Sequence, residues 1–157
     1  FCRVERLSNW SNHYIKIIVY SGFFAMERIM EYTINGKEYT EFDINKRCAE
    51  LSGLSVNTKL ELRVGFTKSF HEKYPHTIWC AEIDRYGEQM SAWEQKIFTR
   101  DATDTWPIIE KCWDDLMVVD MIDYYAQWDL LMCEHNCTKL VAACICFIEI
   151  NEGNESE

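Results

Sequence analysis

Residues 133–137, which read Cys-Glu-His-Asn-Cys, contain the side-chain types that bind zinc. Thiolate and imidazole groups are the usual ligands of structural Zn²⁺. Cys133, His135 and Cys137 therefore form a candidate ligand set, and Cys144 could supply the fourth ligand. A zinc-binding module or a small enzyme built on this cluster is one hypothesis for the function.

The same residues also have a simpler interpretation. The spacing differs from the C-x-x-C pattern of zinc knuckles. Cys144 and Cys146 lie two positions apart, so on a helix they would point to different sides and only one could join the cluster. Ordinary buried thiols beside the start of a helix are the favoured interpretation, and zinc is the alternative.

A second group of possible chemistry is His71 and His76, with Cys80 nearby. A cysteine nucleophile must be exposed and activated by its base. Cys80 lies in the middle of a predicted strand beside Trp79, so we expect it to be a packing residue. The sequence predicts no catalytic residue here.

Acidic side chains gather within ten residues of the chain, at Asp114, Asp115, Asp120 and Asp123. They could form a carboxylate site, but a solvated acidic surface is the commoner arrangement. The chain contains no P-loop, no Rossmann glycines, no G-x-S-x-G and no H-E-x-x-H motif. We therefore expect a non-enzymatic protein without a cofactor.

The charge and composition limit the classes of partner. The formal net charge of the 157 residues is −10, which disfavours direct binding to nucleic acid or to anionic lipid. It permits binding to a basic protein or charge mimicry of a nucleic acid. No apolar run approaches the roughly 20 residues of a membrane-spanning helix. Most of the eight cysteines lie in apolar patterns, which favours free thiols in a reducing cytosol over a disulfide framework.

Three helices must position these residues, at 41–52, 104–116 and 137–149. The first has the clearest signals, because Thr40 and Asp43 have capping-box spacing and Gly53 follows the last apolar position. Pro107 is expected in the first turn of the second helix. Asn136 is expected to be the N-cap of the third.

Strands are predicted at 28–34, 60–66 and 77–83. Asn35-Gly36 is the strongest two-residue hairpin signal in the chain. The patterns predict an antiparallel pairing of 60–66 with 77–83, a connector at 54–58, a loop over 84–100 and strand over 117–132.

Together these elements predict a single α+β domain over 26–152, in which a small antiparallel sheet packs against about three helices. The expected core includes Trp79, Trp106, Trp113 and Phe147. Residues 153–157 are an acidic tail. Residues 1–25 are predicted to be a leader or upstream extension that is dispensable for folding. A signal peptide and an edge strand at 14–20 are the alternatives.

Three segments resemble one protein family. They are Phe42-Asp43-Ile44-Asn45-Lys46 with Ala49-Glu50, then Thr105-Trp106-Pro107-Ile108-Ile109 preceded by Asp101 and Asp104, then Asn136 leading into Leu140-Val141-Ala142-Ala143. In this order they are similar to the NinX-like proteins of lambdoid bacteriophages, small accessory proteins of unknown function. Asp43 and Cys137 depart from the family pattern, which usually has glutamate and proline there. The segment 60–100 is longer than the family pattern, and residues 1–25 have no counterpart.

The resemblance implies a phage protein in the cytosol of a host bacterium and assigns no catalytic residue. With the acidic charge, it leads to the favoured functional hypothesis. This is a non-enzymatic accessory module that binds a host or phage protein, with no direct nucleic-acid or membrane binding.

Overall fold

The computed structural model describes residues 13–20, 23–57, 77–119, 121–122 and 124–153, with side chains from Met30 onward. The predicted strand at 60–66 and its pairing lie outside the described residues, as do His71 and His76.

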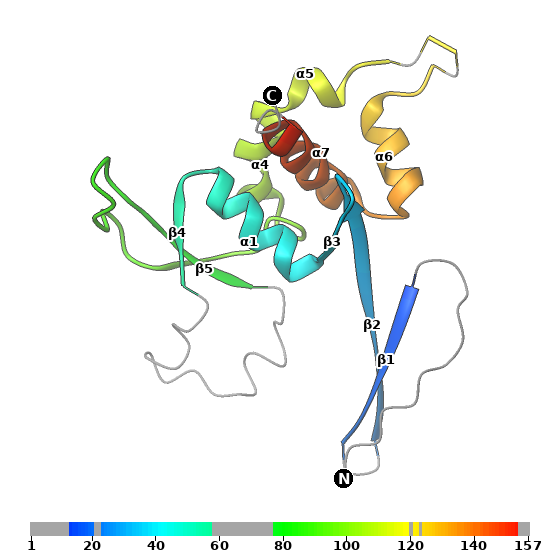
Figure 1. Ribbon diagram of the computed structural model, residues 1–157, viewed down its shortest axis with the longest axis horizontal. Helices are drawn as coiled ribbons and strands as arrows, with labels where there is room; N and C mark the ends of the chain where they lie inside the picture. The colour runs from blue at the N-terminus through cyan, green and yellow to red at the C-terminus, as the bar shows by residue number, and fades with distance from the viewer. Residues whose placement is uncertain (1–12, 21–22, 58–76, 120, 123, 154–157) are drawn as a thin grey trace.

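The described elements, labelled as in Figure 1, are β1 (His13–Tyr20), β2 (Phe23–Ile34), β3 (Lys37–Thr40), α1 (Glu41–Leu51), β4 (Leu54–Val56), β5 (Ile78–Glu82), β6 (Glu94–Lys96), α4 (Ala102–Lys111), α5 (Trp113–Leu116), α6 (Gln127–His135) and α7 (Lys139–Gly153). The strands form two antiparallel sheets, ordered β1-β2-β3 and β4-β5-β6. The predicted α+β class is confirmed, with two sheets in place of one and five described helices in place of three.

Helix α7 is the centre of the fold. All eight residues from 141 to 148 are buried, so the helix is apolar on every side and must be surrounded by protein. Helices α1, α4 and α6 pack against it, as Figure 1 shows. The predicted third helix is confirmed and extends to Gly153. Its first turn is capped by Thr138, whose hydroxyl accepts the Val141 N–H, so the expected cap at Asn136 is wrong.

Helix α1 follows the local signals of the sequence. The Thr40 hydroxyl accepts the Asp43 N–H at 3.2 Å, and the Asp43 carboxylate accepts the Thr40 N–H at 3.0 Å, which completes the capping box. Gly53 has φ +77°, the left-handed conformation that glycine adopts at least cost. The predicted helix and both of its ends are confirmed.

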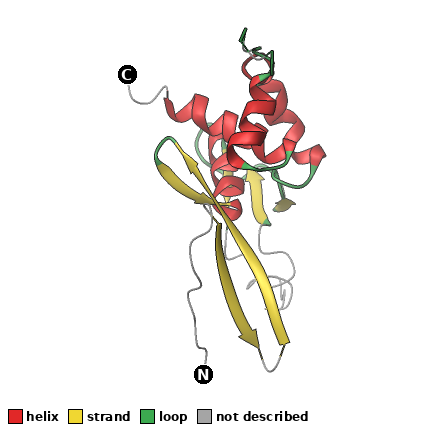
Figure 2. Cartoon of the chain, turned by 90° about the vertical axis from the view of Figure 1, so that its right-hand side faces the viewer, coloured by secondary structure: helices red, strands yellow, loops and turns green. Residues whose placement is uncertain are grey.

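The β2–β3 hairpin turns at Asn35-Gly36, where both residues have positive φ. That is the conformation of a two-residue type I′ turn, as predicted. Strand β1 pairs with β2 over eight residue pairs, from His13–Met30 to Tyr20–Phe23. Figure 2 shows this long hairpin extending away from the helices.

The edge strand weighed as an alternative at 14–20 is therefore present. That residues 1–25 are dispensable for folding stays a prediction. Comparing the thermal unfolding of residues 26–157 with that of the full chain tests it. Equal melting temperatures support the prediction, and an insoluble or much less stable fragment contradicts it.

The predicted second helix is two helices. It starts two residues early at Ala102, where Asp101 caps it by accepting the Thr103 N–H at 2.8 Å. Pro107 therefore lies inside α4 and not in its first turn. The helix ends at Cys112, whose backbone leaves the helical region, and α5 continues from Trp113.

The prediction of strand over 117–132 is wrong. An isolated bridge joins Val119 to Ala126, and α6 then begins at Gln127. Asn136 ends this helix in the left-handed conformation, with φ 46°. It therefore closes α6 and does not start α7, which begins at Lys139.

Two short strands were also missed. Residues 54–56, predicted as connector, form β4, and residues 94–96, predicted as loop, form β6. Both pair with β5, which confirms the strand predicted at 77–83. Strands of three residues carry little periodicity, so their place in the sheet depends on the partner strand.

Buried polar contacts connect distant parts of this core. Asn45, which is fully buried, donates to the Thr99 hydroxyl at 2.9 Å and accepts the Thr99 N–H at 3.0 Å. Near the end of α7, the Glu152 carboxylate accepts from Arg47 at 2.7 Å and from the Tyr39 hydroxyl at 3.0 Å. These contacts hold α1 against both the 97–101 turn and α7.

Candidate functional site

The predicted zinc ligands do not converge. Cys133 and His135 lie two positions apart on α6, so they point to different sides of it. Cys133 is exposed, whereas Cys144 is completely buried in α7. The Cys137 thiol donates to the Leu131 carbonyl at 3.8 Å. Among the described residues, no group of three or more His, Cys, Asp or Glu side chains could hold a metal ion.

The zinc hypothesis stays a prediction that elemental analysis of the purified protein tests. One equivalent of zinc per chain supports it, and a protein that is metal-free after purification without chelators argues against it.

The buried cysteines and the half-buried Cys137 lack the environment of a nucleophile. Burial raises the pKa of Cys80 to about 12 and that of Cys137 to about 11, so both stay protonated at neutral pH. A hydrogen bond with the Cys146 thiol lowers the pKa of Cys112, and that same bond raises the pKa of Cys146. Cys112 is only 1% exposed, so a substrate has no access to it.

Large apolar side chains are exposed along one continuous part of the chain, from α4 to the start of α6. We call this set the tryptophan face. It consists of Trp106, Trp113, Met117, Val118, Val119, Met121, Ile122, Tyr124 and Tyr125. Each of them is at least 44% exposed, and Ile122 reaches 83%. Trp106 and Trp113 lie together in space, because both border one depression, and grouped exposed apolar residues mark interaction sites more often than single ones do.

Both tryptophans were predicted to lie in the core, and that prediction is wrong. Trp106 is 53% exposed and Trp113 is 45% exposed. Of the other two predicted core residues, Phe147 is buried and Trp79 is half-buried. The reason lies in the helix geometry.

The buried stripe of α4–α5 is made by Thr105, Ile108, Ile109, Cys112 and Leu116. On the single regular helix predicted from the sequence, at 100° per residue, Trp106 and Trp113 would lie roughly 85–105° around the helix from the centre of that stripe. This angle is the signal in the sequence that could have identified them.

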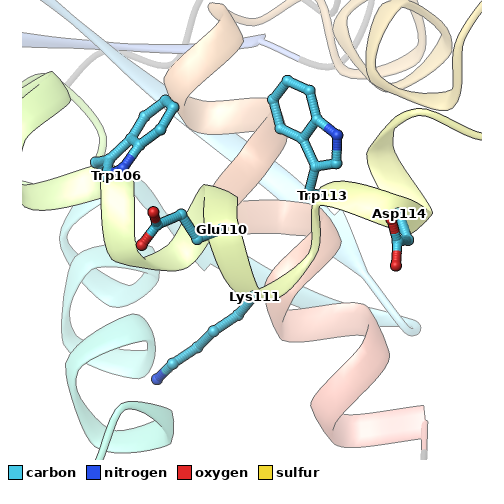
Figure 3. A pocket seen from close by; sticks show the side chains of 5 residues that line it. All are labelled: Trp106, Glu110, Lys111, Trp113 and Asp114. Atoms are coloured by element: carbon cyan, nitrogen blue, oxygen red, sulfur yellow. The ribbon is translucent and has the colours of Figure 1, made fainter.

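The two indoles border an open depression of about 470 Å³, which is also lined by Glu110, Lys111 and Asp114. Figure 3 shows both rings projecting from the same side of α4 and α5, with Glu110 between them along the chain. The Lys111 side chain runs in the opposite direction, and its ammonium group lies 5.7 Å from the Phe147 ring centroid. The Asp114 carboxylate also points away from the Trp113 ring, which leaves Glu110 as the charged side chain between the two indoles.

Trp128 supports this surface from α6. Its ring meets Trp113 edge-on, with centroids 6.4 Å apart and an interplanar angle of 81°. The Trp128 indole N–H donates to the Lys139 carbonyl at 2.8 Å, and the Lys139 ammonium group lies over the ring at 5.4 Å from its centroid. These contacts with α7 fix the Trp128 ring, so Trp113 packs against an immobilised side chain.

The loop between α5 and α6 carries the rest of the tryptophan face. It projects away from the helices in Figure 1. Its base is fastened by the Val119–Ala126 bridge and by the Gln127 N–H, which donates to the Val118 carbonyl at 2.7 Å. Tyr124 has φ +60°, which a non-glycine residue adopts at a cost. The fold holds the exposed loop in a closed shape even though its side chains contribute little burial.

A second depression, of about 610 Å³, lies beside Tyr32, Arg100 and the first turn of α7. The Arg100 guanidinium is already engaged by the Glu41 carboxylate through two bonds of 2.6 and 2.9 Å. Burial raises the pKa of Tyr32 to about 12, so its hydroxyl stays neutral. The two described cationic side chains that line it, Arg100 and Lys139, contact the Glu41 carboxylate and the Trp128 ring, which makes the tryptophan face the stronger candidate.

Two of the four acidic residues considered in the sequence analysis belong to the described part of the chain. Asp114 and Asp115 are both exposed on α5, while Asp120 and Asp123 lie outside the described residues. No single helix of the described chain meets the length and hydropathy of a membrane span. Only α6 and α7 taken together do, and they are bent by 104° at their junction.

Comparison of the chain with protein-family models, with curated proteins and with solved structures returns no match.

Proposed function

We propose that this chain is a non-enzymatic protein-binding module that uses the tryptophan face. The exposure of Trp106 and Trp113 on one side of α4–α5 carries the proposal. Tryptophan, tyrosine and methionine are enriched in protein–protein interfaces, and the tryptophan face contains all three. Exposed indoles are costly in water, so covering them with a partner is favourable.

The resemblance to the NinX-like proteins supports the origin and setting that we propose. The chain would be a bacteriophage accessory protein that acts on a host or phage protein in the cytosol of the bacterium. The Trp-Pro-Ile-Ile segment that gives much of this resemblance includes Trp106 itself.

Capture of partners from a bacterial lysate tests the proposal. The bait is the full chain, compared with a variant that carries Trp106→Ala and Trp113→Ala. Tyr86→Ala is the matched control, because Tyr86 is 75% exposed and belongs to the β5–β6 turn, which lies on the other side of the molecule from α5 and α6 in Figure 1.

We expect one protein to be recovered in stoichiometric yield by the wild type and by Tyr86→Ala, and to be lost with the double variant. Equal recovery by all three baits, or none by any of them at low salt, would contradict the proposed function.

A further inference from the structure

The charges around the tryptophan face carry an inference about the partner, one that rests on the proposed function. Residues 110–125 contain five acidic residues, at 110, 114, 115, 120 and 123, and one lysine, at 111. Of these, Glu110, Asp114 and Asp115 are described and exposed. Glu110 and Asp114 line the depression beside the indoles. The apolar surface therefore has an acidic rim.

We infer that the tryptophan face binds a basic amphipathic helix of its partner. Trp106 and Trp113 belong to consecutive helices and border the same depression, and Figure 3 shows both rings projecting from the same side. A partner helix that lies over this depression can therefore contact both indoles with one apolar stripe. Lysine or arginine side chains flanking that apolar stripe then meet Glu110 and Asp114, the two carboxylates that line the depression.

The same charges disfavour the other occupants of an exposed apolar surface. A second copy would place two acidic rims against each other, and opposing like charges are unfavourable at an interface. Anionic lipid and the phosphates of a nucleic acid would be repelled in the same way. A basic amphipathic helix is the occupant to whose binding both the apolar side chains and the carboxylates of this surface contribute favourably.

Two synthetic helical peptides test the inference. They share one leucine stripe and differ only in their polar face, which is all lysine in one and all glutamate in the other. Binding of each labelled peptide to the full chain is measured by fluorescence anisotropy. We expect the lysine peptide to bind at least about tenfold more tightly than the glutamate peptide, and to weaken as salt rises.

Two charge variants separate a local effect from general attraction to an acidic protein. The first replaces Glu110, Asp114 and Asp115 with lysine. The second replaces Glu82, Glu88 and Glu94 with lysine, which changes the net charge equally at exposed positions of the β5–β6 region. We expect the first variant to reverse the preference between the two peptides, and the second to leave the order unchanged.

Trp106→Ala should weaken binding of the lysine peptide about tenfold or more. This variant tests the role of the indoles even if Trp113→Ala alters folding. If neither peptide binds, if both bind equally, or if the two charge variants behave alike, the inference is overturned. Equal binding of both peptides that still depends on Trp106 would overturn the inference while leaving the proposed function standing. Capture from lysate that ignores both tryptophans would overturn the proposed function itself.

Discussion

Helix α7 and the segment from α4 to α6 are both rich in apolar side chains, and they use them in opposite ways. Eight consecutive residues of α7 are buried, whereas nine large apolar residues between 106 and 125 are exposed. Burying an apolar side chain contributes roughly 1.5–3 kcal/mol, so an exposed group forgoes that stabilisation. Helix α7 therefore stabilises the fold by burial, whereas the tryptophan face is held in place by other contacts and leaves its apolar side chains exposed.

The sharpest test of the first half of this comparison is Phe147→Ala in α7. Phe147 is only 3% exposed, so truncation leaves a cavity at the centre of the fold. We expect a loss of about 3–5 kcal/mol in the free energy of unfolding, measured by urea denaturation. A loss below about 1 kcal/mol would show that α7 does not have the central role described here.

Asn45→Ala should have the next largest effect. It removes both bonds to Thr99 and leaves the buried Thr99 N–H without its acceptor. We expect about 1–3 kcal/mol of destabilisation in the same assay. Asn151→Ala is the matched control, because Asn151 is half-buried and donates one bond, to the Phe147 carbonyl at 2.7 Å. Similar losses of unfolding free energy for the two variants would mean that the two Asn45–Thr99 bonds stabilise the fold no more than the single Asn151 bond does.

Trp106→Ala should cost about 1 kcal/mol, because half of the side chain is already in water. The measurement is again the free energy of unfolding. Both variants truncate an aromatic residue to alanine. The ratio of their losses in unfolding free energy therefore measures how differently the tryptophan face and α7 contribute to stability. A loss as large as that of Phe147→Ala would place Trp106 in the core and remove it from the binding surface.

The smallest effect is confined to acidic pH. Burial alone would raise the pKa of Glu152, but the hydrogen bonds from Arg47 and Tyr39 outweigh it and lower that pKa below its ordinary value of 4.5. A carboxyl group with a lowered pKa in the folded state stabilises the protein above pH 4.5, and this stability is lost as the pH falls through the folded-state pKa. We expect the melting temperature of Glu152→Gln to depend less on pH below 4.5 than that of the wild type. Parallel curves for the two proteins would contradict this.

Local signals account for the parts of the fold that the sequence predicted. The Thr40–Asp43 capping box, the Asn35-Gly36 turn and the apolar run of α7 act between near neighbours, so their effect can be recognised without the rest of the fold. Helix α6 had a comparable signal, because Trp128, Leu131, Met132 and His135 follow the i, i+3, i+4, i+7 spacing of a helix. The β-branched and aromatic residues 118–125 before it favoured strand instead.

The parts that were missed depend on distant contacts. Strands β4 and β6 have three residues each and are defined by pairing with β5. The exposure of Trp106 and Trp113 depends on which face of α4 meets α7, and residue type alone favours burial of tryptophan. The candidate zinc residues were grouped by their nearness in sequence, but Cys133 and His135 diverge on one helix and Cys144 enters the core.

Site-specific photocrosslinking in bacterial cells tests whether the tryptophan face contacts a partner protein. A photoreactive phenylalanine analogue replaces Met121, which is 77% exposed on the tryptophan face, or Tyr86, which is 75% exposed in the β5–β6 turn. The account predicts a discrete crosslinked product from position 121 that disappears when Trp106→Ala is added, and no such product from position 86. Absence of a product at position 121, or the same products from both positions, would contradict the claim that the tryptophan face is a binding surface.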